Sequence, residues 1–93
     1  LHESRRGDFL EEFHKVVPRV LEEAGCVSYG PAVDAETDIE AQVTGGADQV
    51  TIVESWESLG HLKDHLVAEH MVAYRPRVKQ MIRQSTLQIL QSA

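Results

Sequence analysis

Between residues 50 and 71, a stretch of alternating apolar side chains ends at a tryptophan, and a helical pattern begins directly after it. Side chains alternate between the two faces of a strand, so Ile52, Glu54 and Trp56 share one face of a strand predicted over 49–56. Ser58 is a suitable N-cap for the helix that follows, whose apolar positions are Leu59, Leu62 and Leu66. A strand that leads at once into an amphipathic helix restricts the chain to folds in which helices pack against a sheet.

A further helix is predicted near the start of the chain, and the helix after Ser58 is expected to continue beyond a break. Asp8 and Glu11 have the spacing of a capping box, and the apolar positions behind them predict a first helix that ends near Gly25. The helical region that begins after Ser58 is expected to break near residues 67–69. Pro76 suits the start of its continuation, because the first turn of a helix tolerates a residue without a backbone N–H.

Extended patterns are predicted at 26–33 and 85–92, and a polar loop at 34–48. With the strand at 49–56, the order is helix, strand, strand, helix, strand. A strand before residue 5 would complete βαββαβ, so we predict one α+β domain over 1–93, ferredoxin-like with an antiparallel sheet and truncated at its first strand. Helices cover only one face of such a sheet, and we expect the bare face to pair with a second copy in a homodimer.

Composition excludes several classes of partner. The net charge is −6, and the nine basic residues are spread along the chain, which argues against a nucleic-acid-binding face. No apolar run has the length of a membrane span. Cys26 is the only cysteine, so it cannot form an internal disulfide. We therefore expect a cytoplasmic protein in which Cys26 is a small apolar strand residue.

Five short motifs are spread over nearly the whole chain. They are Gly7-Asp8-Phe9, Val17-Pro18-Arg19-Val20, Gly25-Cys26, Glu54-Ser55-Trp56-Glu57-Ser58 and His65-Leu66-Val67-Ala68-Glu69-His70-Met71. In order and spacing they resemble the antibiotic biosynthesis monooxygenase family, whose members often carry a His-Leu-x-x-x-His pattern like the one at 65–70. Each motif is short, and the specificity comes from their combination.

The resemblance implies a ferredoxin-like domain that forms a dimeric α/β barrel, with a pocket between sheet and helices in each protomer. Some relatives oxidise polycyclic phenols or hydroquinones to quinones with molecular oxygen and without metal or flavin. We therefore expect a cofactor-independent monooxygenase-like protein that acts on an aromatic or quinol-type small molecule. Such chemistry needs a dry cavity, a base for the phenol proton and polar donors for the developing charge.

The chain departs from the family pattern at several positions. Relatives that oxidise aromatic molecules have an asparagine four residues before the tryptophan and a tyrosine six residues after it, where this chain has Ile52 and Leu62. Haem-degrading relatives have a ligand histidine where this chain has Arg75 and a tryptophan where it has His65, so haem is not expected. These departures support an alternative, a non-catalytic dimeric α/β barrel that binds a small molecule or regulates another process.

The resemblance and the residue chemistry together select the candidate site. Trp56 would line the pocket, and His65 or His70 would accept or relay a proton, because imidazole exchanges protons near neutral pH. The candidate catalytic residues are Trp56, His65 and His70, and the candidate substrate-binding residues are Trp56, Leu66, Met71, Tyr74 and Arg75. Structural alternatives stay open, with Trp56 as a core anchor and His70 as a buried, hydrogen-bonded histidine.

Two further groups have alternative interpretations. His61 and His65 have helical i, i+4 spacing and could share a metal ion, but no third ligand follows at a recognisable spacing, so no metal centre is predicted. Glu54 lies on the apolar face of its strand, where a carboxylate needs a partner or a raised pKa. An ion pair at the dimer interface is the interpretation we favour for Glu54.

Overall fold

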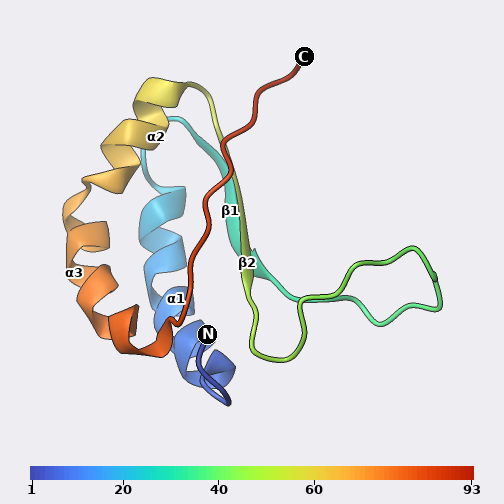
Figure 1. Cartoon of the computed structure of the whole chain (residues 1–93). Coiled ribbons are helices and arrows are strands. Elements are labelled where there is room, and N and C mark those ends of the chain that lie inside the picture. Colours follow the sequence, from blue (N-terminus) through green and yellow to red (C-terminus); the bar gives the residue numbers. More distant parts are fainter.

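The computed structural model describes all 93 residues of the chain. Three helices lie against one side of a two-stranded antiparallel sheet, and a long loop extends away from the sheet (Figure 1). No helix is both long and apolar enough to cross a membrane. In chain order the elements are α1 (Arg6–Leu21), β1 (Cys26–Ala32), β2 (Thr51–Trp56), α2 (Leu59–Leu66), α3 (Glu69–Val78) and the 3₁₀ helix η1 (Lys79–Met81).

Helix α1 supplies the largest share of the core. Its buried residues recur three or four positions apart, which brings them onto one face of the helix: Phe9, Phe13, Val16 and Val20. Phe13 is fully buried and stacks on Tyr29 of β1, with 5.3 Å between ring centroids. The ring of Tyr74 meets Phe13 edge-on at 6.1 Å. These aromatic contacts join α1 to both the sheet and α3.

The predicted capping box is wrong. Helix α1 begins at Arg6, two residues before Asp8, and its N-cap residue Arg5 makes no side-chain cap hydrogen bond. The Asp8 carboxylate instead accepts a hydrogen bond from Nε of Arg5 at 3.1 Å. An acidic side chain in the first turn is still favourable, because it faces the positive end of the helix dipole.

Helices α2 and α3 confirm two local predictions and contradict a third. The Ser58 side chain accepts a hydrogen bond from the backbone N–H of His61, and the helical region breaks after Leu66 as expected. Pro76 does not begin a helix, however, but lies in the last turn of α3. Proline offers no N–H to the preceding turn, and α3 ends two residues later, where η1 follows.

Strands β1 and β2 pair as predicted, and they place Tyr29 opposite Glu54. The pairing is irregular between Cys26 and Ser28. The loop that connects the strands is closed by Asp34, whose Oδ2 accepts hydrogen bonds from the backbone N–H groups of Gly45 and Gly46 at 2.9 and 3.0 Å. Figure 1 shows this loop projecting from the end of the sheet, away from the helices.

The closing strand predicted at 85–92 does not form in the single chain. The segment is extended but belongs to no strand, and residues 1–5 form a turn and contain no strand either. A strand requires backbone partners, and the alternation of Leu87, Gln88 and Ile89 encodes only the extended conformation. The chain remains an α+β domain, but its sheet has two strands in place of the expected four.

Candidate functional site

His65 is the one fully buried polar residue among the core positions, at 2% exposure. It lies in the last turn of α2, which points its imidazole at the helix-facing side of the sheet. The ring lies between two aromatic side chains, 4.7 Å from the ring centroid of Trp56 and 5.4 Å from that of Tyr29. This packing fixes the ring, so its two nitrogens have defined neighbours.

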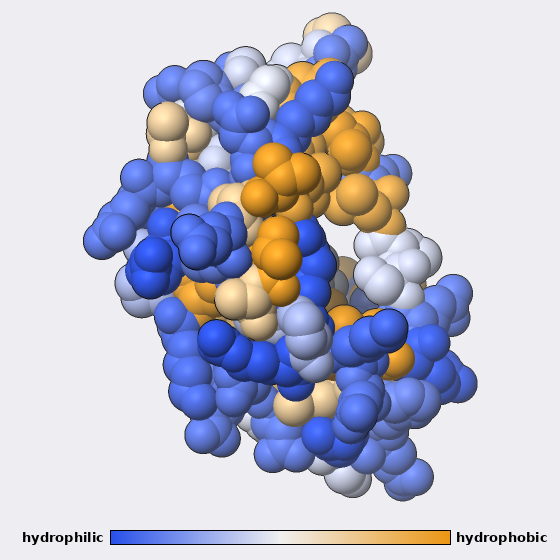
Figure 2. Space-filling view, turned by 90° about the vertical axis from the view of Figure 1, so that its left-hand side faces the viewer, coloured by the Kyte–Doolittle hydropathy of each residue, from blue (hydrophilic) through white to orange (hydrophobic).

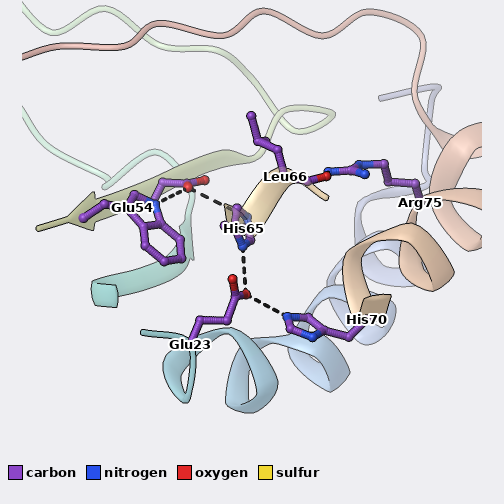
Figure 3. A network of polar contacts seen from close by, with 7 residues as sticks. Glu23, Glu54, His65, Leu66, His70 and Arg75 are labelled. Atoms are coloured by element: carbon purple, nitrogen blue, oxygen red, sulfur yellow. Dashed lines mark hydrogen bonds and ion pairs between the residues drawn. The ribbon is translucent and has the colours of Figure 1, made fainter. Parts of the chain in front are cut away.

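A carboxylate links His65 to the second histidine of the site. Oε2 of Glu23 accepts hydrogen bonds from Nδ1 of His65 at 2.9 Å and from Nε2 of His70 at 2.7 Å (Figure 3). Glu23 follows the end of α1, and His70 lies in the first turn of α3. The ionised carboxylate only accepts, so Nδ1 of His65 and Nε2 of His70 each carry a hydrogen.

The turn that holds Glu23 depends on Gly25. This glycine has a φ of +78°, a backbone conformation that residues with a side chain rarely adopt. A Cβ at this position would also lie 2.2 Å from the ring of His61. His61 is directed to Ser58, whose Oγ lies 2.7 Å from Nδ1 of His61. His61 is therefore part of the helix cap, and the site uses His65 and His70.

A second carboxylate lies on the other side of His65. Oε1 of Glu54 accepts a hydrogen bond from the indole N–H of Trp56 at 2.8 Å and lies 4.0 Å from Nε2 of His65. Glu54 thus has the partners within the chain that a carboxylate on this face needs, and an ion pair of Glu54 at a dimer interface stays a prediction. Figure 3 shows the resulting row of polar groups, with the His65 ring between Glu54 and Glu23.

His65 and Glu54 both line a cavity of about 720 Å³ between the sheet, α3 and the start of the C-terminal segment. Most of its walls are apolar, and the side of the molecule that carries α2 and α3 shows apolar residues gathered around a hollow (Figure 2). Four of the five predicted substrate-binding residues lie on its wall: Leu66, Met71, Tyr74 and Arg75.

Trp56 and His70 do not line this cavity. Trp56 faces a separate cavity of about 700 Å³ that the C-terminal residues 87–92 help to enclose, and Glu54 lies on the wall of both. His70 reaches the site only through Glu23. The sequence-predicted residues are thus close together. Trp56 is connected to the cavity wall through Glu54, whereas His70 is connected to it through Glu23 and then His65.

Burial keeps the phenols and the thiol near the site protonated. It raises the pKa of Tyr74 to about 12, with Glu12 adding to the effect, and it also raises the pKa of Tyr29, to which Glu54 adds. The pKa of Cys26 is raised by burial and by Glu23 and Glu54. At neutral pH the tyrosines therefore act as hydrogen-bond donors, and Cys26 is a thiol and not a nucleophilic thiolate.

Glu23 was missed by sequence reasoning. It lies 42 residues before His65 and 47 before His70, and an acidic residue after an amphipathic helix is ordinarily a solvated one. Its position directly before the Ala24-Gly25 turn was the only local signal. The same three residues offer ligand atoms within 4.8 Å of one another, which makes them the group that could hold a metal ion.

Residues 1–77 match the family model described as antibiotic biosynthesis monooxygenase. The chain belongs to this family. The resemblance seen in the sequence motifs is thereby confirmed, together with the ferredoxin-like α+β class of the fold.

Curated relatives fall into two groups. The chain is 40% identical over 82 residues to the probable quinol monooxygenase YgiN of Escherichia coli (strain K12), a match that covers 88% of this chain and 78% of the relative. The same identity and coverage hold for the probable quinol monooxygenase YgiN of Shigella flexneri. A probable transcriptional regulatory protein of Yersinia pestis (strain Pestoides F) is 35% identical over 57 residues, which are 53% of this chain and 23% of that protein.

Proposed function

We propose that this protein is a monooxygenase that oxidises a quinol-type aromatic molecule with molecular oxygen and without metal, flavin or haem. Membership of the antibiotic biosynthesis monooxygenase family and the 40% identity to a probable quinol monooxygenase support the reaction class. The observation that carries the proposal is His65 on the wall of a mostly apolar cavity, with its Nδ1 hydrogen-bonded to Glu23.

His65 is the proposed base. Glu23 holds the hydrogen on Nδ1, so Nε2 of the neutral ring has a free lone pair on the side of Glu54 and the cavity. A phenolic O–H that approaches Nε2 transfers its proton there, and the carboxylate of Glu23 stabilises the imidazolium that forms. Glu23 is thus a positioning residue, in the same sense that a carboxylate orients a catalytic histidine in hydrolases.

The remaining steps are reactions between the substrate and oxygen. The phenolate passes one electron to O₂, and the aryloxyl radical and superoxide combine into a C–O bond at a ring carbon. The peroxide takes up the proton, the C–H bond at that carbon breaks, and the O–O bond cleaves. One oxygen atom stays as the new carbonyl and the other leaves as water. Apolar walls suit this sequence because they limit the access of bulk water to the radical pair.

The other cavity residues have supporting roles. Tyr74 stays protonated and can donate a hydrogen bond to a substrate oxygen. Arg75 donates through Nη2 to the backbone carbonyl of Leu66, which ties α3 to the end of α2 beside the cavity. Trp56 holds the Glu54 carboxylate next to His65 through its indole N–H. Leu66 and Met71 supply apolar wall.

A homodimer is part of the proposal. The sheet face away from the helices carries exposed Val27 and Val53, at 65% and 57% exposure, and the C-terminal segment exposes Leu87 and Leu90 at 71% and 78%. A second copy would cover this apolar surface and offer backbone partners to the extended C-terminal segment. We place the protein in the cytoplasm, because a reducing compartment suits its single, unpaired cysteine.

A non-catalytic binding role is the second candidate. Ile52 lines the main cavity where aromatic-oxidising relatives have a polar side chain, and Leu62 lines the other cavity. The loss of two polar groups favours a protein that binds an aromatic molecule without converting it. In that case ligand affinity persists although oxygen uptake is absent.

Oxygen uptake on a panel of hydroquinones and anthrones separates the two roles. We expect turnover by the wild type, with His65→Ala reducing kcat by roughly 10²-fold or more. His14→Ala, on an exposed position of α1, is the matched control and keeps full activity. Binding of the quinone products by calorimetry without any oxygen uptake would instead establish the binding role. Turnover that His65→Ala leaves unchanged would refute the assignment of the base.

A further inference from the structure

Glu23, His65 and His70 form a preorganised set of metal ligands. Their ligand atoms all lie within 4.8 Å of one another, and they come from the turn after α1, from α2 and from α3. Their side chains are 13%, 3% and 18% exposed, so the cluster is largely shielded from solvent. Two imidazoles and one carboxylate are a ligand set that binds Zn²⁺ and other divalent transition metals and leaves a coordination position open.

We propose that this cluster is a binding site for a divalent transition metal such as Zn²⁺, and that an occupied site inhibits the oxidation proposed above. Metal binding requires only the three residues of the cluster. Inhibition rests on the proposed function, because it also requires His65 to be the base.

The distances require only a small rearrangement. Oε2 of Glu23 lies 2.9 Å from Nδ1 of His65 and 2.7 Å from Nε2 of His70. Ligand atoms around a tetrahedral zinc ion lie about 3.3 Å apart, as follows from bond lengths of about 2.0–2.1 Å. The two contacts to Glu23 therefore have to lengthen by roughly half an ångström. His65 is fixed by its aromatic neighbours, so the more exposed His70 and Glu23 supply the movement.

Glu54 is a separate observation that points to the same site. Its Oε1 lies 4.0 Å from Nε2 of His65, on the opposite side of the ring from Glu23, and the indole of Trp56 holds it there. A histidine that binds a metal through one ring nitrogen commonly donates the N–H of the other to a carboxylate, which orients the ring and raises its basicity. Glu54 would be that acceptor once its Oε1 approaches Nε2 of His65 from 4.0 Å to hydrogen-bond distance.

The two states of His65 exclude each other. Without metal, Nδ1 carries the hydrogen and Nε2 has the lone pair that accepts the substrate proton. With metal on Nδ1, the hydrogen moves to Nε2 and faces Glu54, and the hydrogen of His70 likewise moves from Nε2 to Nδ1. Both rings stay neutral and no proton is lost, but Nε2 of His65 no longer has a lone pair. Metal binding thus removes the base without displacing any side chain from the cavity wall.

The test begins with metal binding. Protein dialysed against a chelator is titrated with Zn²⁺ by calorimetry and with Co²⁺ by visible absorption, where a tetrahedral site gives strong bands. We expect one ion per chain, and affinity at least tenfold lower in Glu23→Gln and His70→Ala. Glu22→Gln and His14→Ala, both exposed, keep wild-type affinity. Circular dichroism of each variant establishes that it is folded, and Glu54→Gln gives a second, milder loss if a ligand variant does not fold.

Activity is the second measurement. We expect Zn²⁺ to inhibit quinol oxidation with a concentration dependence that matches the calorimetric affinity, and the chelator to restore the rate. Absence of metal binding, or binding that both ligand variants leave unchanged, overturns the site. Binding without inhibition of an active enzyme overturns the inhibition. A protein that binds metal but oxidises no quinol retains the site and refutes the proposed function, so the two failures are distinguishable.

Discussion

Oε2 of Glu23 lies 2.9 Å from Nδ1 of His65, although 42 residues separate them in the chain. The contact joins the end of α1 to the end of α2 beneath the cavity, and it decides which nitrogen of His65 carries the hydrogen. A buried imidazole held by a carboxylate has one defined tautomer and one free ring nitrogen. That single relationship underlies both the proposed base and the proposed metal site.

Glu23→Gln tests the positioning role. The amide can donate as well as accept, so it no longer enforces the tautomer that leaves Nε2 of His65 free. We expect kcat for quinol oxidation to fall by about 10²-fold while KM changes by roughly twofold or less. Glu22→Gln, one residue away and exposed, is the control. Equal activity of the two variants in steady-state oxygen uptake would contradict a role for Glu23.

Phe13→Ala tests the core. Phe13 is fully buried between Phe9, Tyr29 and Tyr74, and its truncation leaves a cavity that these rings cannot fill. We expect the free energy of unfolding to fall by roughly 3–5 kcal/mol in denaturant titration. Val43→Ala, at a loop position that is 92% exposed, should change it by about 0.5 kcal/mol or less. A small effect of Phe13→Ala would mean that the aromatic cluster is not the centre of the core.

Alkaline pH should destabilise the protein through its buried tyrosines. The pKa of Tyr74 is raised from its ordinary value of 10.0 to about 12, so the folded state holds the phenolic proton more tightly than the unfolded chain. The stabilising contribution is fully present below about pH 10 and is lost as the pH rises from about 10 to about 12. We expect the melting temperature to drop over this range, and less steeply in Tyr74→Phe.

Tyrosinate absorbance during the same titration gives an independent measurement. The two tyrosines, Tyr29 and Tyr74, are both buried and both have raised pKa values. Their ionisation should therefore coincide with unfolding. Ionisation of both phenols near pH 10 in a protein that remains folded would rule out the burial argument.

The proposed homodimer can be tested through the exposed apolar surface that it would cover. Light scattering after size exclusion should give the mass of two chains, and Val53→Asp should give one, because a carboxylate cannot be buried unpaired in the interface. Val43→Asp in the projecting loop is the matched control and should remain dimeric. A wild-type protein that is monomeric at all accessible concentrations would refute the dimer.

Local patterns in the sequence were sufficient for the elements whose causes are local. The spacing of Phe9, Phe13 and Val20 determines the buried face of α1, and the Ser58 side chain caps α2, because both effects act within one or two helical turns. Alternation likewise predicted that Glu54 and Trp56 share one face of their strand, and there the indole of Trp56 donates to Glu54. The family motifs could be recognised in the sequence for the same reason, since each is a short run of neighbouring residues.

Tertiary structure alone decided the rest. Whether residues 85–92 form a strand depends on a backbone partner, which alternation does not supply. The meeting of Glu23 with His65 and His70 depends on how α1, α2 and α3 pack, and no spacing along the chain encodes it. Side-chain periodicity reports which way a residue faces, whereas hydrogen bonds and ligand clusters are set by distances between segments far apart in the sequence.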